Sequence, residues 1–189
     1  MNAPFSKQPL RMSRAEYRAW AEAQPRGRFE RVAGEVVAMA PERAAHNLVK
    51  MRVWRALDAA VRAAGLPCQA FGDGMTVEIG EDHDYEPDAV VNCGDALDAD
   101  AVATPNPVVV VEVLSPSTQS TDTGAKLADY FRVPSVRHYL IIRTRDRRAI
   151  HHRRSGDGEG IETRVLADGV LRLDPPGFEV AIADFYPEA

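Results

Sequence analysis

The sequence PVVVVEVLSPST, residues 107–118, decides the fold. Its run of β-branched residues is typical of a central strand that is covered on both faces of a sheet. Glu112 interrupts this run and has a valine on each side. A buried carboxylate is strongly unfavourable unless it is paired, protonated or bound to a cation. Either Glu112 is stabilised in one of these ways near the strand end, or the strand ends at Val111 and Glu112 is solvated.

A second carboxylate stands at the start of the preceding predicted strand. Asp88 follows Pro87 and begins the segment 88–92, which is mostly apolar. If the two strands are neighbours, Asp88 and Glu112 meet at one end of the sheet, where carboxylates repel unless they share a proton or a divalent metal. Magnesium takes oxygen ligands, often one or two carboxylates, and keeps several waters. The pair therefore predicts metal-assisted hydrolysis of a phosphodiester.

Strands and helices alternate along the rest of the chain. The capping-box pair Ser13 and Glu16 predicts a helix that ends near Gln24, and an apolar face predicts a second helix over residues 44–64. Further predicted elements are strands at 29–32, 35–39, 75–79, 136–143 and 149–152, and a helix from Thr121 or Asp122 to Arg132. This order predicts an α/β fold, in which helices flank a mixed β-sheet. We expect one domain over residues 13–186, preceded by an N-terminal extension over residues 1–12.

Composition places the chain among ordinary globular proteins. It has 189 residues, of which 45% are hydrophobic and 27% are charged. The N-terminus lacks the apolar segment of a signal peptide, and no run of residues is long and apolar enough to span a membrane. Two cysteines, Cys68 and Cys93, are too few for a disulfide framework. These features predict a cytoplasmic protein that is not inserted in a membrane.

The net charge of −5 is unevenly distributed. Residues 63–106 contain ten acidic residues and no Lys or Arg, and their acidic stretch at 81–86 is typical of a solvated turn. Residues 143–154 contain six arginines and one aspartate at a predicted hairpin, and three more arginines line one helix face, namely Arg52, Arg55 and Arg62. Either basic group has the charge to follow a phosphate backbone, although solvated surface arginines would give the same pattern.

Several separate motifs resemble those of the Uma-type family of restriction endonucleases, within the PD-(D/E)XK nuclease superfamily. They are FERVAGE (29–35), His46, Pro87-Asp88, VVVEVLSPST (109–118), Lys126 and Tyr130. The likeness spans about residues 10–185, and the valine-rich strand with the lysine-containing helix after it is its most specific part. The resemblance implies a restriction endonuclease-like fold.

The resemblance also implies roles for individual residues. Asp88 and Glu112 would be the acidic ligands of Mg²⁺ or Mn²⁺. The superfamily lysine normally stands two residues after the second acid, but Leu114 occupies that place here. In the similar family this lysine lies on the following helix, where the present sequence has Lys126. There it could orient the attacking water or stabilise the charge of the phosphate in the transition state.

Other candidates complete the expected site. Glu30 would be a third acid that ligates the metal directly or through water, and Glu35 is its competitor because it also lies in a strand. His46 could hydrogen-bond a substrate phosphate or a ligating carboxylate. Ser117 and Gln119 follow Glu112 in a loop that could line the site.

The expected function is therefore a metal-dependent endonuclease that hydrolyses the phosphodiester bonds of DNA, with double-stranded DNA the expected substrate. Similar proteins often form homodimers, and two active sites would be needed to cut both strands. One alternative is a catalytically silent module on the same fold that binds nucleic acid or protein. Another is a metal-dependent hydrolase that acts on a different phosphodiester.

Overall fold

The computed structural model describes residues 10–114 and 123–187. The helices are α1 (Arg14–Glu22), α2 (Ala44–Ala63) and α3 (Thr123–Tyr130), with a 3-10 helix, η1 (Ile182–Phe185), near the C-terminus. The strands are β1 (Phe29–Val32), β2 (Glu35–Ala38), β3 (Cys68–Gly72), β4 (Val77–Ile79), β5 (His83–Tyr85), β6 (Ala89–Cys93), β7 (Pro107–Leu114), β8 (His138–Arg143), β9 (Arg148–Arg154), β10 (Ile161–Leu166), β11 (Val170–Leu173) and β12 (Phe178–Ala181). The elements predicted with ranges are all present with slightly shifted ends, whereas no ranges were predicted for β3, β5, β10, β11, β12 and η1.

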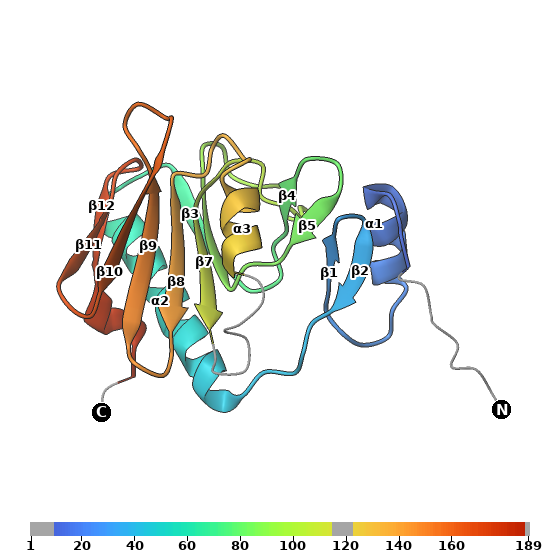
Figure 1. Ribbon diagram of the computed structural model, residues 1–189, viewed down its shortest axis with the longest axis horizontal. Coiled ribbons are helices and arrows are strands. Elements are labelled where there is room, and N and C mark those ends of the chain that lie inside the picture. The colour runs from blue at the N-terminus through green and yellow to red at the C-terminus, as the bar shows by residue number, and fades with distance from the viewer. Residues whose placement is uncertain (1–9, 115–122, 188–189) are drawn as a thin grey trace.

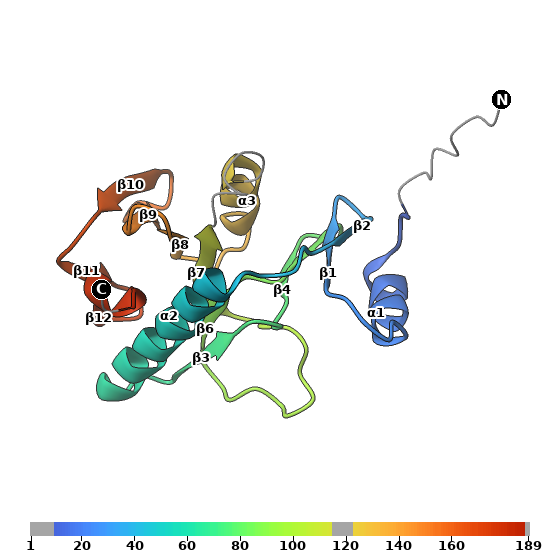
Figure 2. The same cartoon turned by 90° about the horizontal axis from the view of Figure 1, so that it is seen from below.

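A six-stranded sheet in the order β10-β9-β8-β7-β6-β3 forms the centre of the fold. Strands β7 and β8 are parallel, and the other pairs in this sheet are antiparallel. Helix α2 covers one face and α3 covers the other (Figures 1 and 2). The alternation of β7 explains both cores, because Val109 and Val111 pack on the α2 side while Val110 packs with Tyr130 of α3. The expected mixed sheet flanked by helices is confirmed.

A second sheet, in the order β2-β1-β5-β4, lies beside the main sheet next to α1 (Figure 1). It corrects the expectation of a solvated turn at residues 81–86, because β5 pairs with both β1 and β4. Asp84 of β5 is buried and forms ion pairs with Arg31 and with Arg14, the latter at 2.6 Å. Two arginines from distant parts of the chain therefore compensate a carboxylate that looks solvent-exposed in sequence.

Local sequence signals fix several element ends. Ser13 and Glu16 form the predicted capping box at the start of α1. The β1–β2 hairpin turns at Ala33 and Gly34, and both residues have positive φ angles, which glycine tolerates best. Helix α2 buries the expected apolar face against the main sheet. The expected limits of the domain, residues 13 and 186, are not tested by these elements and remain a prediction.

The two cysteines are bonded to each other, which the sequence analysis did not predict. Cys68 and Cys93 are register partners on the neighbouring strands β3 and β6, and they form a disulfide. Spacing in sequence could not reveal this pair, because only the pairing of the strands brings the two side chains together. In the parts of the chain that the structure describes, no helix has the length and apolar character needed to cross a membrane.

Candidate active site

The candidate site lies where β7 ends, between the beginning of α2 and the helix α3. Strands β6 and β7 are antiparallel neighbours with Ala89 opposite Val111, so Asp88 and Glu112 follow at the same end of the pair. The backbone N–H of Val113 donates a hydrogen bond of 2.6 Å to Asp88 Oδ2. The sheet therefore holds the carboxylate of Asp88 directly beside the residue that follows Glu112.

Lys126 links two of the predicted acids. Its Nζ atom lies 3.0 Å from Glu30 Oε1 and 3.0 Å from Glu112 Oε1. Glu112 Oε1 also accepts a hydrogen bond of 2.7 Å from the hydroxyl of Tyr130, one helical turn after Lys126. Glu30 Oε1 accepts a second hydrogen bond of 3.0 Å, from the backbone N–H of Glu86. Residues from β1, β7 and α3 thus converge on one ammonium group.

Burial and like charge dominate the electrostatics of this cluster. Burial, together with the negative charge of Glu112, raises the pKa of Asp88 to about 6, although Lys50 opposes the shift. Burial also raises the pKa of Glu30 despite the neighbouring Lys126. Burial lowers the pKa of Lys126, but Glu112 and Glu30 outweigh it, so the net pKa is raised and the ammonium stays charged.

A second lysine, which the sequence analysis missed, lies on the other side of Asp88. Lys50 of α2 is only 4% exposed, and its Nζ atom lies 2.9 Å from Asp88 Oδ1 and 2.6 Å from Asp73 Oδ2. It also forms an ion pair with Glu42. A signal for it exists in the sequence, because Lys50 falls on the apolar face of α2 between Val49 and Val53, as Glu112 falls among valines. A charged residue on a buried face requires a partner.

The carboxylates around Lys50 form a possible cation-binding group that the sequence analysis did not predict. The ligand atoms of Glu42, Asp73 and Asp88 all lie within 4.8 Å of one another. Glu42 and Asp73 are more exposed than Asp88 and also form ion pairs with Arg28. Asp88 is therefore shared by two acidic groups, one with Lys50 and one with Glu112.

Of the other predicted residues, some lie at the cluster, one lies away from it and some are not described. His46 Nε2 lies 2.6 Å from the carbonyl oxygen of Val113 and 3.8 Å from Asp88 Oδ2, so its hydrogen bond goes to the main chain beside Asp88. Glu35 forms an ion pair of 3.1 Å with Arg11 near the surface, whereas Glu30 contacts Lys126. Ser117 and Gln119 lie outside the described residues, as do Thr121 and Asp122.

The three predicted acids have the chemistry of cation ligands, but among the residues that the structure describes, the acids whose ligand atoms all lie within 4.8 Å of one another are Glu42, Asp73 and Asp88, not Glu30, Asp88 and Glu112. Glu30, Asp88 and Glu112 supply carboxylate oxygens, the ligands that Mg²⁺ and Mn²⁺ prefer. Burial, followed by the negative charge of Glu112, raises the pKa of Asp88 and of Glu30 even though Lys50 and Lys126 lie beside them. A bound cation would oppose these shifts and favour the ionised forms. Asp88 belongs to both acidic groups, so a cation held near it would draw its other ligands from one group or the other.

The fold is shared with a solved structure. A crystal structure from Anabaena variabilis, described as a putative nuclease belonging to DUF820, superposes with a TM-score of 0.67 at 15% sequence identity. The match covers 88% of this chain and 94% of the other. At this level of identity the likeness establishes the fold.

Comparison of sequences then identifies the family. Two uncharacterized proteins of Synechocystis sp., slr1290 and sll1609, are each 27% identical to this chain. The first match covers 98% of this chain and 94% of the relative, and the second covers 83% and 89%. Residues 14–183 match the Uma2 family, described as "Putative restriction endonuclease", and the chain belongs to this family. The resemblance noted in the sequence is confirmed.

Proposed function

We propose that this protein is an endonuclease that uses Mg²⁺ or Mn²⁺ to hydrolyse phosphodiester bonds of double-stranded DNA. The observation that carries the proposal is the contact of Lys126 with both Glu30 and Glu112 at 3.0 Å, beside the buried carboxylate of Asp88. Membership of the Uma2 family supports the class of reaction. The contacts of Lys126 support the choice of Glu30 and Glu112 as residues of the site.

In this proposal Asp88, Glu112 and Glu30 hold the cation. A bound cation would polarise the phosphate and make water a better nucleophile. Lys126 keeps a fixed positive charge at the site, where it stabilises the negative charge that develops on the phosphate. Its ammonium takes the place of the superfamily lysine, which Leu114 replaces in sequence.

Other residues position the ligands. The hydroxyl of Tyr130 donates to Glu112 and limits the rotation of its carboxylate. His46 binds the carbonyl of Val113, whose N–H in turn holds Asp88, so the histidine acts on the metal ligand through the main chain. Cleavage of both strands of a duplex requires two such sites, and we propose a homodimer as the active form.

Cleavage of supercoiled plasmid DNA tests the proposal. We expect nicking and linearisation with Mg²⁺ or Mn²⁺ and none with EDTA. Asp88→Asn and Glu112→Gln should abolish cleavage while the circular dichroism spectrum stays that of the folded protein. Glu35→Gln is the matched control, because it makes the same chemical change at an acid that lies outside the cluster. This variant should cleave as the wild type does.

Three results would contradict the proposal in different ways. If the wild type binds DNA but cleaves nothing with either metal, the protein is a binding module on a nuclease fold. If Glu112→Gln and Glu35→Gln reduce cleavage equally, the cluster is not the active site. If a small phosphodiester is hydrolysed but DNA is not, the protein acts on another substrate.

A further inference from the structure

The turn between β8 and β9 lies at the same edge of the sheet as the candidate active site. Because β7 and β8 are parallel, with Leu114 beside Arg143, their C-terminal ends meet at this edge (Figure 1). The N–H and the hydroxyl of Thr144 both donate to the carbonyl oxygen of Leu114, at 3.2 and 3.1 Å. The turn is thus attached to β7 two residues beyond Glu112.

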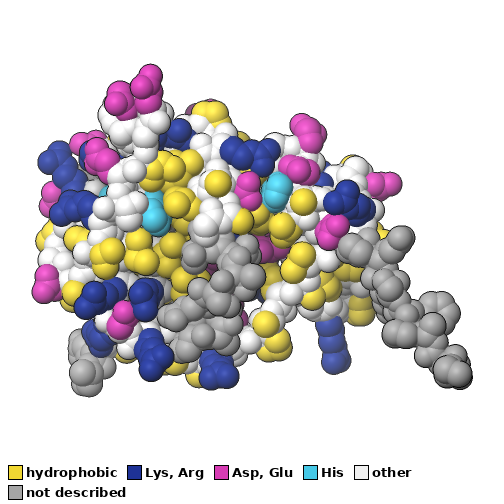
Figure 3. All heavy atoms as spheres, in the orientation of Figure 1, with side chains coloured by type: hydrophobic (Ala, Val, Ile, Leu, Met, Phe, Trp, Pro, Cys, Tyr) yellow, Lys and Arg dark blue, Asp and Glu magenta, His cyan; other side chains and the backbone are white. Residues whose placement is uncertain are grey.

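This turn, residues 143–148, is strongly basic. It contains four arginines and one aspartate, a net charge of +3 in a chain whose total is −5. Asp146 is shared by Arg143 at 3.1 Å and Arg148 at 4.0 Å, and Arg145 is exposed without an ion pair to any described residue. Positively charged side chains are visible along the lower edge of the molecule, below β8 and β9 (Figure 3). The positive charge of the turn therefore exceeds what its own acid can neutralise.

The remaining arginines of the basic segment 143–154 have structural partners. Arg153 forms an ion pair of 3.1 Å with Glu162 on β10. Arg154 donates to the carbonyl oxygen of Phe131 at 2.7 Å and lies over its ring. These two residues stand at the other end of β9, so the hairpin arginines do not form one surface as the sequence suggested. Only the turn faces the edge with the acidic cluster.

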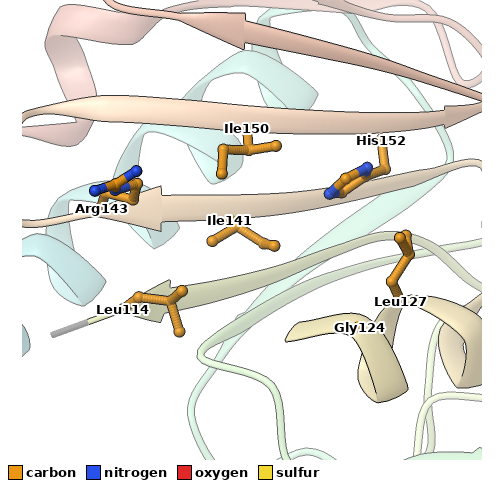
Figure 4. A pocket seen from close by; sticks show the side chains of 7 residues that line it. All are labelled: Leu114, Gly124, Leu127, Ile141, Arg143, Ile150 and His152. Atoms are coloured by element: carbon orange, nitrogen blue, oxygen red, sulfur yellow. The ribbon is translucent and has the colours of Figure 1, made fainter. Parts of the chain in front are cut away.

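Contacts of Arg147 attach the turn to the C-terminal segment. Arg147 has a positive φ of 51°, and its guanidinium donates to the carbonyl oxygen of Pro187 at 3.0 Å and lies over the ring of Tyr186. Figure 4 shows Arg143 with Leu114 at one end of a groove between α3 and the sheet, away from His152. An ordered turn loses little conformational entropy when it binds a ligand.

We propose that the turn 143–148 binds the phosphate backbone of double-helical DNA next to the acidic cluster. This inference rests on the proposed function, because it names the surface that brings the substrate to that site. Arginines bind phosphate oxygens and position a protein on DNA without reading its sequence. The turn contains no aromatic residue on which an unpaired base could stack, which favours a duplex over a single strand.

Salt-dependent binding of a fluorescent DNA duplex tests the inference. The wild type is measured in EDTA, so that no cleavage occurs, over a series of NaCl concentrations. The test variant is Arg145→Ala with Arg148→Ala, which spares Arg143, with its 3.1 Å ion pair to Asp146, and Arg147, which contacts Pro187 and Tyr186. The matched control is Arg52→Ala with Arg55→Ala, which removes the same charge from an exposed part of α2.

We expect the turn variant to bind about tenfold more weakly at low salt, and its log–log salt slope to fall by about 2, or about 1 for each lost phosphate contact. The control should keep the slope of the wild type. The inference is overturned if both variants lose affinity equally, if only the α2 variant does, or if the wild type binds no duplex at low salt. It is also overturned if the turn variant weakens binding of a single strand but not of the duplex.

The binding and cleavage assays separate this inference from the proposed function. If the wild type cleaves DNA with metal but the turn variant binds DNA as the wild type does, the proposed endonuclease function stands and the proposed binding surface is wrong. Binding that depends on the turn, without cleavage in Mg²⁺ or Mn²⁺, supports the surface and rejects the enzyme.

Discussion

Two buried clusters of titratable side chains include residues of the main sheet, and they are built in opposite ways. In the acidic cluster, carboxylates of Glu30 and Glu112 share the ammonium of Lys126. In the histidine cluster, His138 Nδ1 lies 2.8 Å from His151 Nε2, and His138 Nε2 donates to the carbonyl oxygen of Pro175 at 2.8 Å. The first cluster is held together by charge, and the second by hydrogen bonds between groups that can all be neutral.

The difference shows in the direction of the pKa shifts. Burial lowers the pKa of His138 to about 4 and that of His151 to about 3, so both rings are neutral at pH 7. Burial and the charge of Glu112 raise the pKa of Asp88 to about 6, although Lys50 lies 2.9 Å away, so near pH 6 this carboxylate is close to taking up a proton. Both clusters bury titratable groups, but only in the acidic cluster would a bound cation stabilise the ionised side chains. Burial alone does not identify an active site.

The largest expected effect comes from removing the ammonium group of Lys126 from the acidic cluster. Lys126→Met leaves Glu30 and Glu112 without their shared partner and removes charge stabilisation from the transition state. We expect the cleavage rate at saturating Mn²⁺ to fall by about 100- to 1000-fold. His151→Gln, in the other cluster, should leave the rate per folded molecule unchanged. An equal loss in both variants would show that the two clusters do not differ in function.

The histidine cluster should instead control how stability depends on pH. Because His138 has a folded pKa of about 4 against 6.5 in the unfolded chain, the unfolded state binds the proton first as pH falls. The stabilisation is complete above pH 6.5 and is lost as pH falls toward 4, at up to about 1.4 kcal/mol per pH unit for each histidine. Urea unfolding at several pH values measures this slope, and His151→Gln should make it shallower.

Asp88 should have the opposite effect in the same experiment. Its folded pKa of about 6 lies above the value of 3.8 for a free aspartate, so the folded state binds the proton first. Its contribution to stability is gained as pH falls from 6 to 3.8 and is lost as pH rises through 6. Asp88→Asn should therefore steepen the loss of stability in acid, whereas His151→Gln reduces it. Changes of the same sign in both variants would contradict the contrast between the clusters.

The smallest expected effect concerns a single hydroxyl. Tyr130→Phe removes the hydrogen bond of 2.7 Å to Glu112 but keeps the ring in the core. A hydrogen bond to a charged group contributes about 1.5–3 kcal/mol, so cleavage should slow by at least about tenfold. Tyr186→Phe is the matched control, because its buried hydroxyl has no hydrogen-bond partner among the described residues. This variant should cleave at the wild-type rate.

Much of the site was predictable because it breaks a local pattern. Glu112 among valines and Asp88 before an apolar strand are anomalies that single segments reveal. Lys50 breaks the apolar face of α2 in the same way, and this signal could have been used. Glu30 and Glu35 both fit a strand, and choosing between them required knowing that β1, and not β2, brings its glutamate to Lys126.

The sequence by itself determined the elements that depend on neighbours in the chain: the capping box of α1, the β1–β2 hairpin, the apolar face of α2 and the valine strand β7. The tertiary structure decided the contacts between distant segments, such as Arg31 with Asp84, Cys68 with Cys93, and Lys126 with Glu30. It also divided the basic segment, placing the turn 143–148 near the acids and Arg153 with Glu162. The physical reason is that backbone propensity and apolar periodicity act over a few residues, whereas the partner of a buried charge is set by strand order and register.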